Sequence, residues 1–446
     1  MTLQHRPMTA RVQDEGSPPT APGPLRVVFA SVHAGGGHNT VRDALVRSVT
    51  RQDPQQQRLI PISWTAANGF DTFYRFCVRW GLQGLVFWLT NFSFSAWGAT
   101  LLNPRLMLEL LALLKAQRPD VVVSTHIQLT ACFQLARLLS RSRTRIVNVI
   151  PDYGAPTPTF FPRQRWLRAD ATLVNGSDTF EALSRRAAPD ELYRVGTLVS
   201  EVFDEVASGL RVRTPATREQ ARVELADAAP DLARLDASKP VVAFFGGSGF
   251  TAGCRPVIER LVRHPDLGVK FSMVVLAGRD ASLETELLTL YGGRRGFFVL
   301  GFLPHPQLAQ LYALTDVPVL GSIAHSTLQE LLAMRCGPLL VHRVIPGTEP
   351  PYRDFIERER LGLYEPDPER MTALVLESLG VTSASLVLRS LRHEFSRRAE
   401  RLRDEHKALA PRLLEQLERL AGRPPRGLAA GAPARTASAD GPTPGD

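Results

Sequence analysis

The chain alternates short, uninterrupted apolar runs with longer amphipathic stretches, and this alternation restricts its fold more than any other feature of the sequence. Each run holds four to six residues, mostly Val, Ile, Leu and Phe, as is typical of parallel strands covered on both faces. Strands that alternate with helices predict an α/β protein with doubly wound sheets. The predicted strands are 25–30, 121–124, 146–150, 171–174, 241–245, 271–276, 297–300, 317–320 and 338–341.

The amphipathic stretches between the runs predict helices at 40–51, 256–264, 284–291 and 326–334. Pro256 suits the first turn of the second of these helices. A strongly charged pattern at 385–420 predicts one long helix packed across the outside of the molecule.

The domain organisation follows from length and from changes in composition. A chain of 446 residues is too long for one ordinary core, so about two to three domains are expected. Both ends are rich in Pro, Gly, Ser and Ala, which predicts disorder. We predict a tail at 1–24, a first α/β half at 25–205, a second at 206–375, helices at 376–421 and a second tail at 422–446.

The chain carries a net charge of +9, from 53 basic and 44 acidic residues. This balance favours an anionic partner, which can be nucleic acid, an acidic membrane surface or a phosphorylated ligand. A GC-rich genome would also produce the many arginines. Because the sequence has no aromatic-basic motif, we expect no nucleic-acid role.

Cysteine spacing and the N-terminal residues favour a reducing compartment. The four cysteines show no C-x-x-C spacing, so neither a disulfide framework nor a zinc ribbon is expected. Each is expected to be a small buried hydrophobe. Residues 1–24 lack the apolar segment of a signal peptide, so we expect a cytoplasmic protein.

Two glycine-rich turns each follow the first predicted strand of a half. In the first half, Gly35, Gly36 and Gly37 lead into a helix that begins near His38. Glycines at a helix N-terminus let backbone N–H groups approach a ligand closely. A histidine at this place can take a proton from a hydroxyl near neutral pH. The alternative is a tight packing turn with an incidental histidine.

The second turn comprises Gly246, Gly247, Ser248 and Gly249, directly after the run 241–245. Its backbone N–H groups and its hydroxyl can cradle a diphosphate. No Gly-Lys-Ser/Thr follows, so the turn is not a Walker motif. It also differs from G-x-G-x-x-G, so the sequence does not favour hydride transfer.

A polar stretch follows the run 317–320. Thr327 and Glu330 have the spacing of a capping box, which predicts a structural role at the start of a helix. In the functional alternative, Glu330 accepts hydrogen bonds from ribose hydroxyls, and Ser326 and Thr327 lie near phosphate. Two more acidic residues follow predicted strands, where ligands of α/β sheets usually bind: Asp152 and Glu349. An ordinary turn aspartate is the alternative for Asp152.

Residues 80–104 contain no charged residue, although arginines precede and follow them. Aromatic rings prefer the depth of lipid headgroups and arginines favour anionic lipid, so two amphipathic segments in a membrane interface are expected. A buried pair of helices is the alternative. The aromatic residues of this segment are Trp80, Phe87, Trp88, Phe92, Phe94 and Trp97.

The order of these motifs resembles a group of glycosyltransferases. Gly-Gly-Gly-His comes first, and Pro-Asp-Val-Val-Val-Ser-Thr-His at 119–126 and Asp-Tyr at 152–153 follow. Then come Gly-Gly-Ser-Gly, Ala-Gly-Arg at 277–279, Gly-Phe-Leu at 301–303, Ser-Thr-x-x-Glu at 326–330 and Pro-Gly-x-Glu at 346–349. Over residues 25–375 this set looks like the monogalactosyldiacylglycerol synthases and processive diacylglycerol glucosyltransferases. It is more distantly similar to the N-acetylglucosaminyltransferase of peptidoglycan lipid-intermediate synthesis.

The resemblance implies a GT-B fold, in which two Rossmann-like domains face a central cleft. A nucleotide sugar, expected to be UDP-linked, would bind the second domain, and a lipid acceptor would bind the first. By resemblance, His38 is a candidate base, and the turn 247–249 holds the donor diphosphate. Glu330 would hold the ribose and Glu349 would contact the transferred sugar. The segment 80–97 matches the membrane-docking, acceptor-binding region of the family.

The chain departs from the family pattern at two loops on the sugar and phosphate side of the donor site. Ile323, Ala324 and His325 stand where the family has a glycine-rich turn. Thr348 stands in place of a glutamine, and Tyr352 in place of an asparagine.

The expected function is inverting transfer of a hexose to a lipid such as diacylglycerol, at the inner face of the cell membrane. His38 or Asp152 would deprotonate the acceptor hydroxyl, and N–H groups at 246–249 would stabilise the leaving diphosphate. No Asp-x-Asp metal motif lies at a suitable place, so no metal or other cofactor is expected. The alternatives are a sugar-nucleotide 2-epimerase and a catalytically silent protein that binds nucleotide sugar or membrane.

Overall fold

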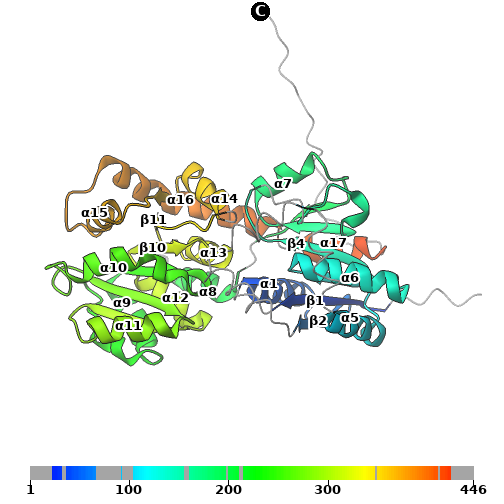
Figure 1. Cartoon of the computed structure of the whole chain (residues 1–446), viewed down its shortest axis with the longest axis horizontal. Helices are drawn as coiled ribbons and strands as arrows, with labels where there is room; N and C mark the ends of the chain where they lie inside the picture. The colour runs from blue at the N-terminus through cyan, green and yellow to red at the C-terminus, as the bar shows by residue number, and fades with distance from the viewer. Residues whose placement is uncertain are drawn as a thin grey trace, which may run out of the picture.

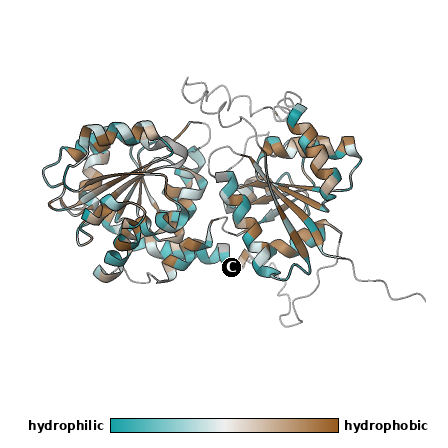
Figure 2. Cartoon of the chain, turned by 90° about the horizontal axis from the view of Figure 1, so that it is seen from below, coloured by the Kyte–Doolittle hydropathy of each residue, from teal (hydrophilic) through white to brown (hydrophobic). Residues whose placement is uncertain are grey.

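The computed structural model describes residues 23–32, 37–66, 92, 104–154, 160–196, 199–209, 214–346, 349–409 and 412–422. In this part the chain forms two halves, each built on a parallel six-stranded sheet (Figure 1). Helices surround the largely apolar strands of each sheet and carry hydrophilic residues on their outer sides (Figure 2). This is the doubly wound α/β architecture that the sequence predicts.

The first sheet has the strand order β2-β1-β3-β4-β5-β6. Alternate residues of β1 belong to two separate cores: Val27 and Phe29 pack on one face, and Val28 and Ala30 on the other. Because both faces are covered, the central strands are continuously apolar. The strands are β1 Leu25–Val32, β2 Leu59–Ala66, β3 Val121–Ser124, β4 Arg145–Ile150, β5 Ala171–Val174 and β6 Leu192–Arg194.

Helices cover both faces of this first sheet. Leu45 of α1 packs into the same core as Val27, whereas Leu110 of α5 and Phe133 of α6 pack on the opposite face. In the part of this half that the structure describes, the helices between the strands are α1 Gly37–Gln52, α5 Pro104–Gln117, α6 Ile127–Ser140, the short η1 Arg165–Leu167 and α7 Ser177–Ser184.

The second sheet has the order β12-β11-β10-β7-β8-β9 and repeats this division. Val242 and Phe244 of β7 pack on one face, and Ala243 and Phe245 on the other. The strands are β7 Val241–Gly246, β8 Ser272–Gly278, β9 Phe297–Gly301, β10 Val317–Ser322, β11 Leu339–Val341 and β12 Gly362–Tyr364. The helices described in this half are α8 Glu201–Gly209, α9 Pro215–Ala226, η2 Pro230–Arg234, η3 Gly247–Cys254, α10 Arg255–Val262, α11 Ala281–Tyr291, α12 His305–Leu314, α13 His325–Ala333, α14 Pro350–Arg358 and α15 Pro368–Ser378.

All nine predicted strands are present, and their ends differ from the prediction by at most two residues. The four predicted helices are also present, with Pro256 in the first turn of α10. The sequence did not reveal β2, β6 and β12, which all lie at sheet edges. β2 is partly exposed and contains Pro61, while β6 and β12 have three residues each, so none of them forms a continuous apolar run.

The single long helix predicted at 385–420 is wrong. The structure has α16 Leu386–Leu409 on the second half and α17 Arg412–Leu420 on the first. Phe395 of α16 packs into a core of the second half, whereas Leu414 and Leu417 of α17 pack into the core that contains Val27. The C-terminal segment therefore passes from the second half back to the first. Each sheet lies within one of the two predicted halves, 25–205 and 206–375. The exact limits of the halves remain predictions.

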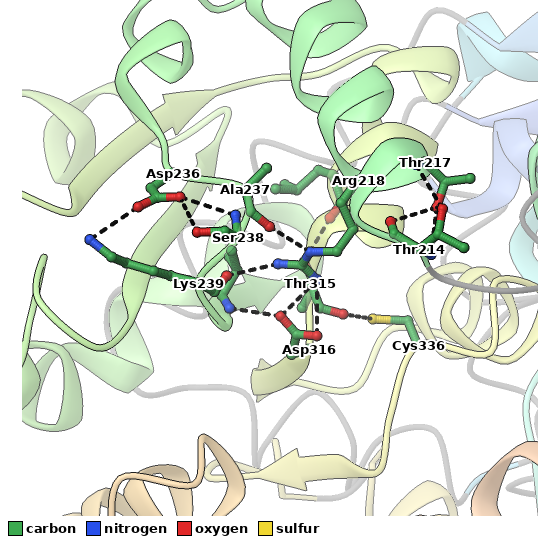
Figure 3. A network of polar contacts seen from close by, with 12 residues as sticks. Thr214, Thr217, Arg218, Asp236, Ala237, Ser238, Lys239, Thr315, Asp316 and Cys336 are labelled. Carbon is green, nitrogen blue, oxygen red and sulfur yellow. Dashed lines mark hydrogen bonds and ion pairs between the residues drawn. The ribbon is translucent and has the colours of Figure 1, made fainter.

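A polar network holds α9 against the amino ends of the second sheet (Figure 3). Arg218 of α9 donates to both carboxylate oxygens of Asp316, at 3.0 and 2.9 Å. It also donates to the carbonyl oxygens of Ala237 and Lys239, both at 2.8 Å. Asp316 in turn accepts from the backbone N–H of Val241 at 2.8 Å. The network thus ties α9 to the first residue of β7, at the edge opposite the carboxyl ends of the strands.

None of the helices in the described ranges has both the length and the apolar character needed to cross a membrane.

Candidate active site between the halves

Residues from both halves meet at the carboxyl ends of the parallel strands, the edge at which α/β sheets usually bind ligands. In the first half, His38, Thr125, Asp152 and Asn175 follow β1, β3, β4 and β5. In the second half, η3 follows β7 and α13 follows β10. Hydrogen-bonded side-chain pairs join the two edges directly.

His38 lies in the first turn of α1 and is partly buried. Its Nδ1 is 2.6 Å from the backbone carbonyl oxygen of Thr125. Because a carbonyl oxygen only accepts, Nδ1 carries the hydrogen and Nε2 keeps its lone pair. Burial lowers the pKa of His38, and the Asp152 charge and the Thr125 carbonyl partly offset this lowering. His38 is therefore a neutral imidazole that can accept a proton at neutral pH.

Asp152 lies just beyond β4 and is held from both halves. Its backbone carbonyl accepts from the hydroxyl of Thr179 in α7 at 2.7 Å. Its Oδ1 accepts a hydrogen bond from the hydroxyl of Tyr352 in α14. The sequence marked Tyr352 only as a departure from the family pattern, and nothing local connects it to Asp152, which lies 200 residues away.

His126 is a titratable residue of this edge to which the sequence assigned no role. Its ring lies edge-on to that of His38, with 4.8 Å between ring centroids. Burial lowers the pKa of His126 well below that of a free histidine, and His38 lowers it further. The signal in the sequence is its place directly after β3, in the Ser-Thr-His motif.

Two further pairs cross between the halves beside Asp152. Gln329 of α13 donates to the hydroxyl of Tyr153. Asn175 Nδ2 lies 3.3 Å from Nε2 of His325, the first residue of α13. His325 and Gln329 thus both join α13 to the first half, and His325 stands where the family that the sequence resembles has a glycine-rich turn.

The second glycine turn is the start of η3, so Gly247, Ser248 and Gly249 lead directly into a helical turn at the end of β7. A Cβ placed on Gly253 would lie 3.2 Å from the carbonyl oxygen of Gly321 and 3.2 Å from Cγ of Arg343. The last turn of η3 therefore packs closely on the end of β10. Arg343 brings a positive charge to this place, a feature that the sequence did not single out.

The predicted capping box at Thr327 and Glu330 is wrong. The N-cap of α13 is Ala324, with no side-chain hydrogen bond, so both residues lie inside the helix. Glu330 is buried, and its Oε2 accepts from the hydroxyl of Tyr312 at 2.9 Å. Burial raises the pKa of Glu330 to about 7, and the bond from Tyr312 partly offsets the rise. Ser326 is the second residue of α13, at the positive end of the helix.

Glu349 is buried at the start of α14. Its carboxylate accepts from the hydroxyl of Ser322 at 2.5 Å and from the backbone N–H of Ile345 at 2.7 Å. Burial raises the pKa of Glu349, and these bonds partly offset the rise. Glu349 therefore ties the loop after β11 to the end of β10, and its contact with a sugar stays a prediction.

Several predicted residues lie outside the described part of the chain. These are Gly35 and Gly36 of the first glycine turn and five aromatic residues of the proposed membrane segment: Trp80, Phe87, Trp88, Phe94 and Trp97. Phe92 is described, and its side chain is exposed. Among the residues that the structure describes, no three or more His, Cys, Asp or Glu side chains form a group that could hold a metal ion.

No family model matches the sequence, and no curated protein matches it. Solved structures match over most of the chain. Trehalose 6-phosphate synthase from Burkholderia multivorans is 16% identical with a TM-score of 0.54, over 90% of this chain and 97% of that one. MurG of Acinetobacter baumannii is 14% identical with a TM-score of 0.50, over 89% and 100%. A structure of S. aureus MnaA with UDP is 12% identical with a TM-score of 0.53, over 83% and 90%.

At these identities the likeness concerns the fold alone. The narrower resemblance to monogalactosyldiacylglycerol synthases stays a prediction. The two parallel sheets and these neighbours together confirm the fold class that the resemblance implied. The chain has the GT-B fold, with two Rossmann-like domains.

Proposed function

We propose that the chain is an inverting glycosyltransferase that moves a hexose from a UDP-linked sugar to a lipid acceptor such as diacylglycerol. The observation that carries the proposal is the state of His38. Its Nδ1–H is held by the Thr125 carbonyl, which leaves the lone pair of Nε2 to act as a base at the carboxyl edge of the first sheet. The positive end of α13 and the glycine turn of η3 lie on the second-half side.

In the proposed reaction, His38 Nε2 takes the proton of the acceptor hydroxyl as its oxygen attacks the anomeric carbon. The new glycosidic bond forms while the bond from that carbon to the diphosphate oxygen breaks, and its electron pair leaves with the nucleoside diphosphate. Asp152 stabilises the imidazolium that His38 becomes. Direct deprotonation by Asp152 is the alternative.

The second half would hold the donor. Backbone N–H groups at Gly247, Ser248 and Gly249 and at the N-terminus of α13 would bind the leaving diphosphate, with Ser326 and Thr327 beside it. Glu330 would contact the ribose and Glu349 the sugar. The UDP named in the MnaA structure supports a nucleotide donor on this fold. The proposal involves no metal ion or other cofactor.

The acceptor side of the proposal rests on the aromatic segment 80–97 and the net charge of +9. Aromatic rings and arginines together favour an anionic membrane surface. We therefore propose a peripheral location at the inner face of the cell membrane. The exposed side chain of Phe92 supports this location.

One assay separates this proposal from its alternatives. The protein is incubated with radiolabelled UDP-glucose or UDP-galactose and a lipid extract in vesicles. Label in lipid supports the transferase. Nucleoside diphosphate without labelled lipid supports hydrolysis or epimerisation. Epimerisation is tested because the fold resembles that of a putative UDP-N-acetylglucosamine 2-epimerase from Listeria monocytogenes, with a TM-score of 0.50. If the UDP-sugar remains intact in every reaction, the result contradicts an enzymatic activity and supports a protein that only binds nucleotide sugar or membrane.

A further inference from the structure

We propose that Tyr352 of the second half is a positioning residue that fixes the Asp152 carboxylate at the carboxyl edge of the first sheet, the edge that also carries His38. The acceptor-side base of the first half would then be complete only when α14 contacts it. This inference rests on the proposed function, and it concerns a residue at which the chain differs from the family it resembles.

The geometry divides the support of Asp152 between the halves. The first half fixes its backbone, because Thr179 of α7 donates to its carbonyl oxygen at 2.7 Å. The second half fixes its side chain, because the Tyr352 hydroxyl donates to Oδ1. Among the described residues, Tyr352 is the only group that donates a hydrogen bond to this carboxylate. Without the hydroxyl, the carboxylate could rotate away from His38 while its backbone stayed in place.

Tyr352 is itself rigidly placed. It follows Pro350 and Pro351 in the first turn of α14, and its side chain is buried. Its ring packs edge-on against that of Tyr153, with 5.5 Å between centroids. On the facing turn, Gly154 has a φ of +77°, and a Cβ there would lie 2.5 Å from Cβ of Pro351. The turn at Gly154 and the first turn of α14 therefore pack closely together, which keeps the Tyr352 hydroxyl on Oδ1 of Asp152.

The chemistry of the phenol suits this role. Burial and the charge of Asp152 raise the pKa of Tyr352 well above its usual value, so its hydroxyl remains a donor across the working pH range. The Asp152 charge raises the pKa of His38. A carboxylate held in this place therefore stabilises the imidazolium formed when His38 accepts the acceptor proton.

The titratable groups around this pair are few. The ring of His126 contacts that of His38 and the charge of Asp152 acts on it, whereas Asp152, Tyr153 and Glu349 act on Tyr352. His126 is held neutral by burial, so over the pH range of interest Asp152 is the charged group that a change at Tyr352 displaces.

The test compares Tyr352→Phe with Tyr153→Phe. Each variant removes one hydroxyl, and each removes one hydrogen bond between the halves, but only the Tyr352 hydroxyl bonds to the Asp152 carboxylate. In the transfer assay with UDP-sugar and lipid vesicles, Y352F is expected to lower kcat about 10-fold with donor KM nearly unchanged. The acid limb of its kcat/KM profile moves to lower pH, because His38 loses the charge that raises its pKa. Y153F keeps both kcat and the profile.

A second readout does not depend on turnover. Histidine NMR titration of the full chain, with the His38 signal assigned by His38→Asn, is expected to show a lower midpoint for His38 in Y352F than in wild type. Y153F is expected to leave the midpoint unchanged, and thermal melting checks that both variants are folded.

Equal effects of the two variants on kcat, or an unchanged His38 midpoint in Y352F, would overturn the positioning role. Absence of transfer by wild type with either UDP-sugar would instead contradict the proposed function. In that case the NMR titration still decides whether Tyr352 places the Asp152 charge where it acts on His38, so the two failures are distinguishable.

Discussion

The hydroxyl of Tyr312 donates a hydrogen bond of 2.9 Å to Oε2 of Glu330, inside the second half. Both side chains are buried, and burial raises the pKa of Glu330 to about 7. The folded protein thus binds a proton at Glu330 more tightly than the unfolded chain does, where the pKa of a glutamate is near 4.5.

Replacing Glu330 by Gln is expected to stabilise the protein at pH 8 and to have little effect at pH 5. A raised carboxyl pKa gives stability that is present below pH 4.5 and is lost as pH rises towards about 7. At pH 8 the expected difference in free energy of unfolding between E330Q and wild type is on the order of 3 kcal/mol. Denaturant unfolding at several pH values measures it. Glu369→Gln, a change at an exposed residue, is the control. If the difference in free energy of unfolding between E330Q and wild type stays constant from pH 5 to pH 8, the raised pKa of Glu330 is contradicted.

Replacing His38 by Ala is expected to reduce sugar transfer by about 10² to 10⁴-fold, because the variant lacks the proposed general base. Binding of UDP is expected to be unchanged, since His38 lies on the first half and the proposed diphosphate turn on the second. Isothermal titration with UDP and the transfer assay measure the two effects separately. In wild type the acid limb of kcat/KM is expected below the pKa of a free histidine, because burial lowers the pKa of His38.

The control for His38 is His393 of α16, whose side chain is exposed and which is not one of the candidate site residues. His393→Ala is expected to keep full activity. Normal turnover in His38→Ala would remove the catalytic assignment and leave Asp152 as the candidate base.

Replacing Glu418 by Ala is expected to destabilise the protein by about 3 kcal/mol, because it leaves Arg58 without its partner in a largely buried ion pair. Arg58 donates to both oxygens of Glu418, at 2.9 and 2.6 Å, and the Glu418 side chain is only 4% exposed. Thermal or urea unfolding checks the loss. Arg412→Ala, an exposed change in the same helix, is the control. Comparable unfolding of both variants would mean that α17 is not fixed to the first half by this pair.

Replacing Arg218 by Lys is expected to cost about 2 kcal/mol, because an ammonium group cannot make the four hydrogen bonds that the guanidinium makes to Asp316, Ala237 and Lys239 (Figure 3). Arg222→Lys is the matched control in the same helix, since Arg222 also makes four hydrogen bonds, to Glu219 and to the carbonyl oxygen of Ala233, but none of these partners belongs to the sheet. Urea unfolding compares the two variants, and a larger loss in Arg222→Lys would show that the network does not hold α9 to the sheet.

The sequence predicted the central strands well, because a strand covered on both faces must be apolar throughout, and such a run is visible without any partner. It did not reveal β2, β6 and β12, since an edge strand needs fewer apolar residues and is defined by its neighbour. The candidate site was predictable for the same local reason: a glycine turn after a strand places His38 and the residues 247–249 at the carboxyl edge whatever the rest of the chain does.

The partners of the site residues were not predictable. Glu330 has the spacing of a capping-box residue from Thr327, yet α13 begins two residues before Thr327, and Glu330 lies against Tyr312 instead. In the sequence, Tyr352 only replaces an asparagine of the family's donor-site loop, yet in the structure its hydroxyl donates to Asp152 of the other half. The charged pattern at 385–420 predicted one helix, although its second part forms a separate helix, α17, that packs on the first half.

By itself the sequence determined two α/β halves and the places where their strands end, because hydrophobic periodicity and glycine turns act within a few residues of the chain. Only the tertiary structure decided which side chains distant in sequence meet: Tyr352 with Asp152 and Gln329 with Tyr153 across the halves, and Arg58 with Glu418 where α17 packs on the first half. These pairs join residues 176 to 360 positions apart, and their contact depends on how whole helices and sheets pack.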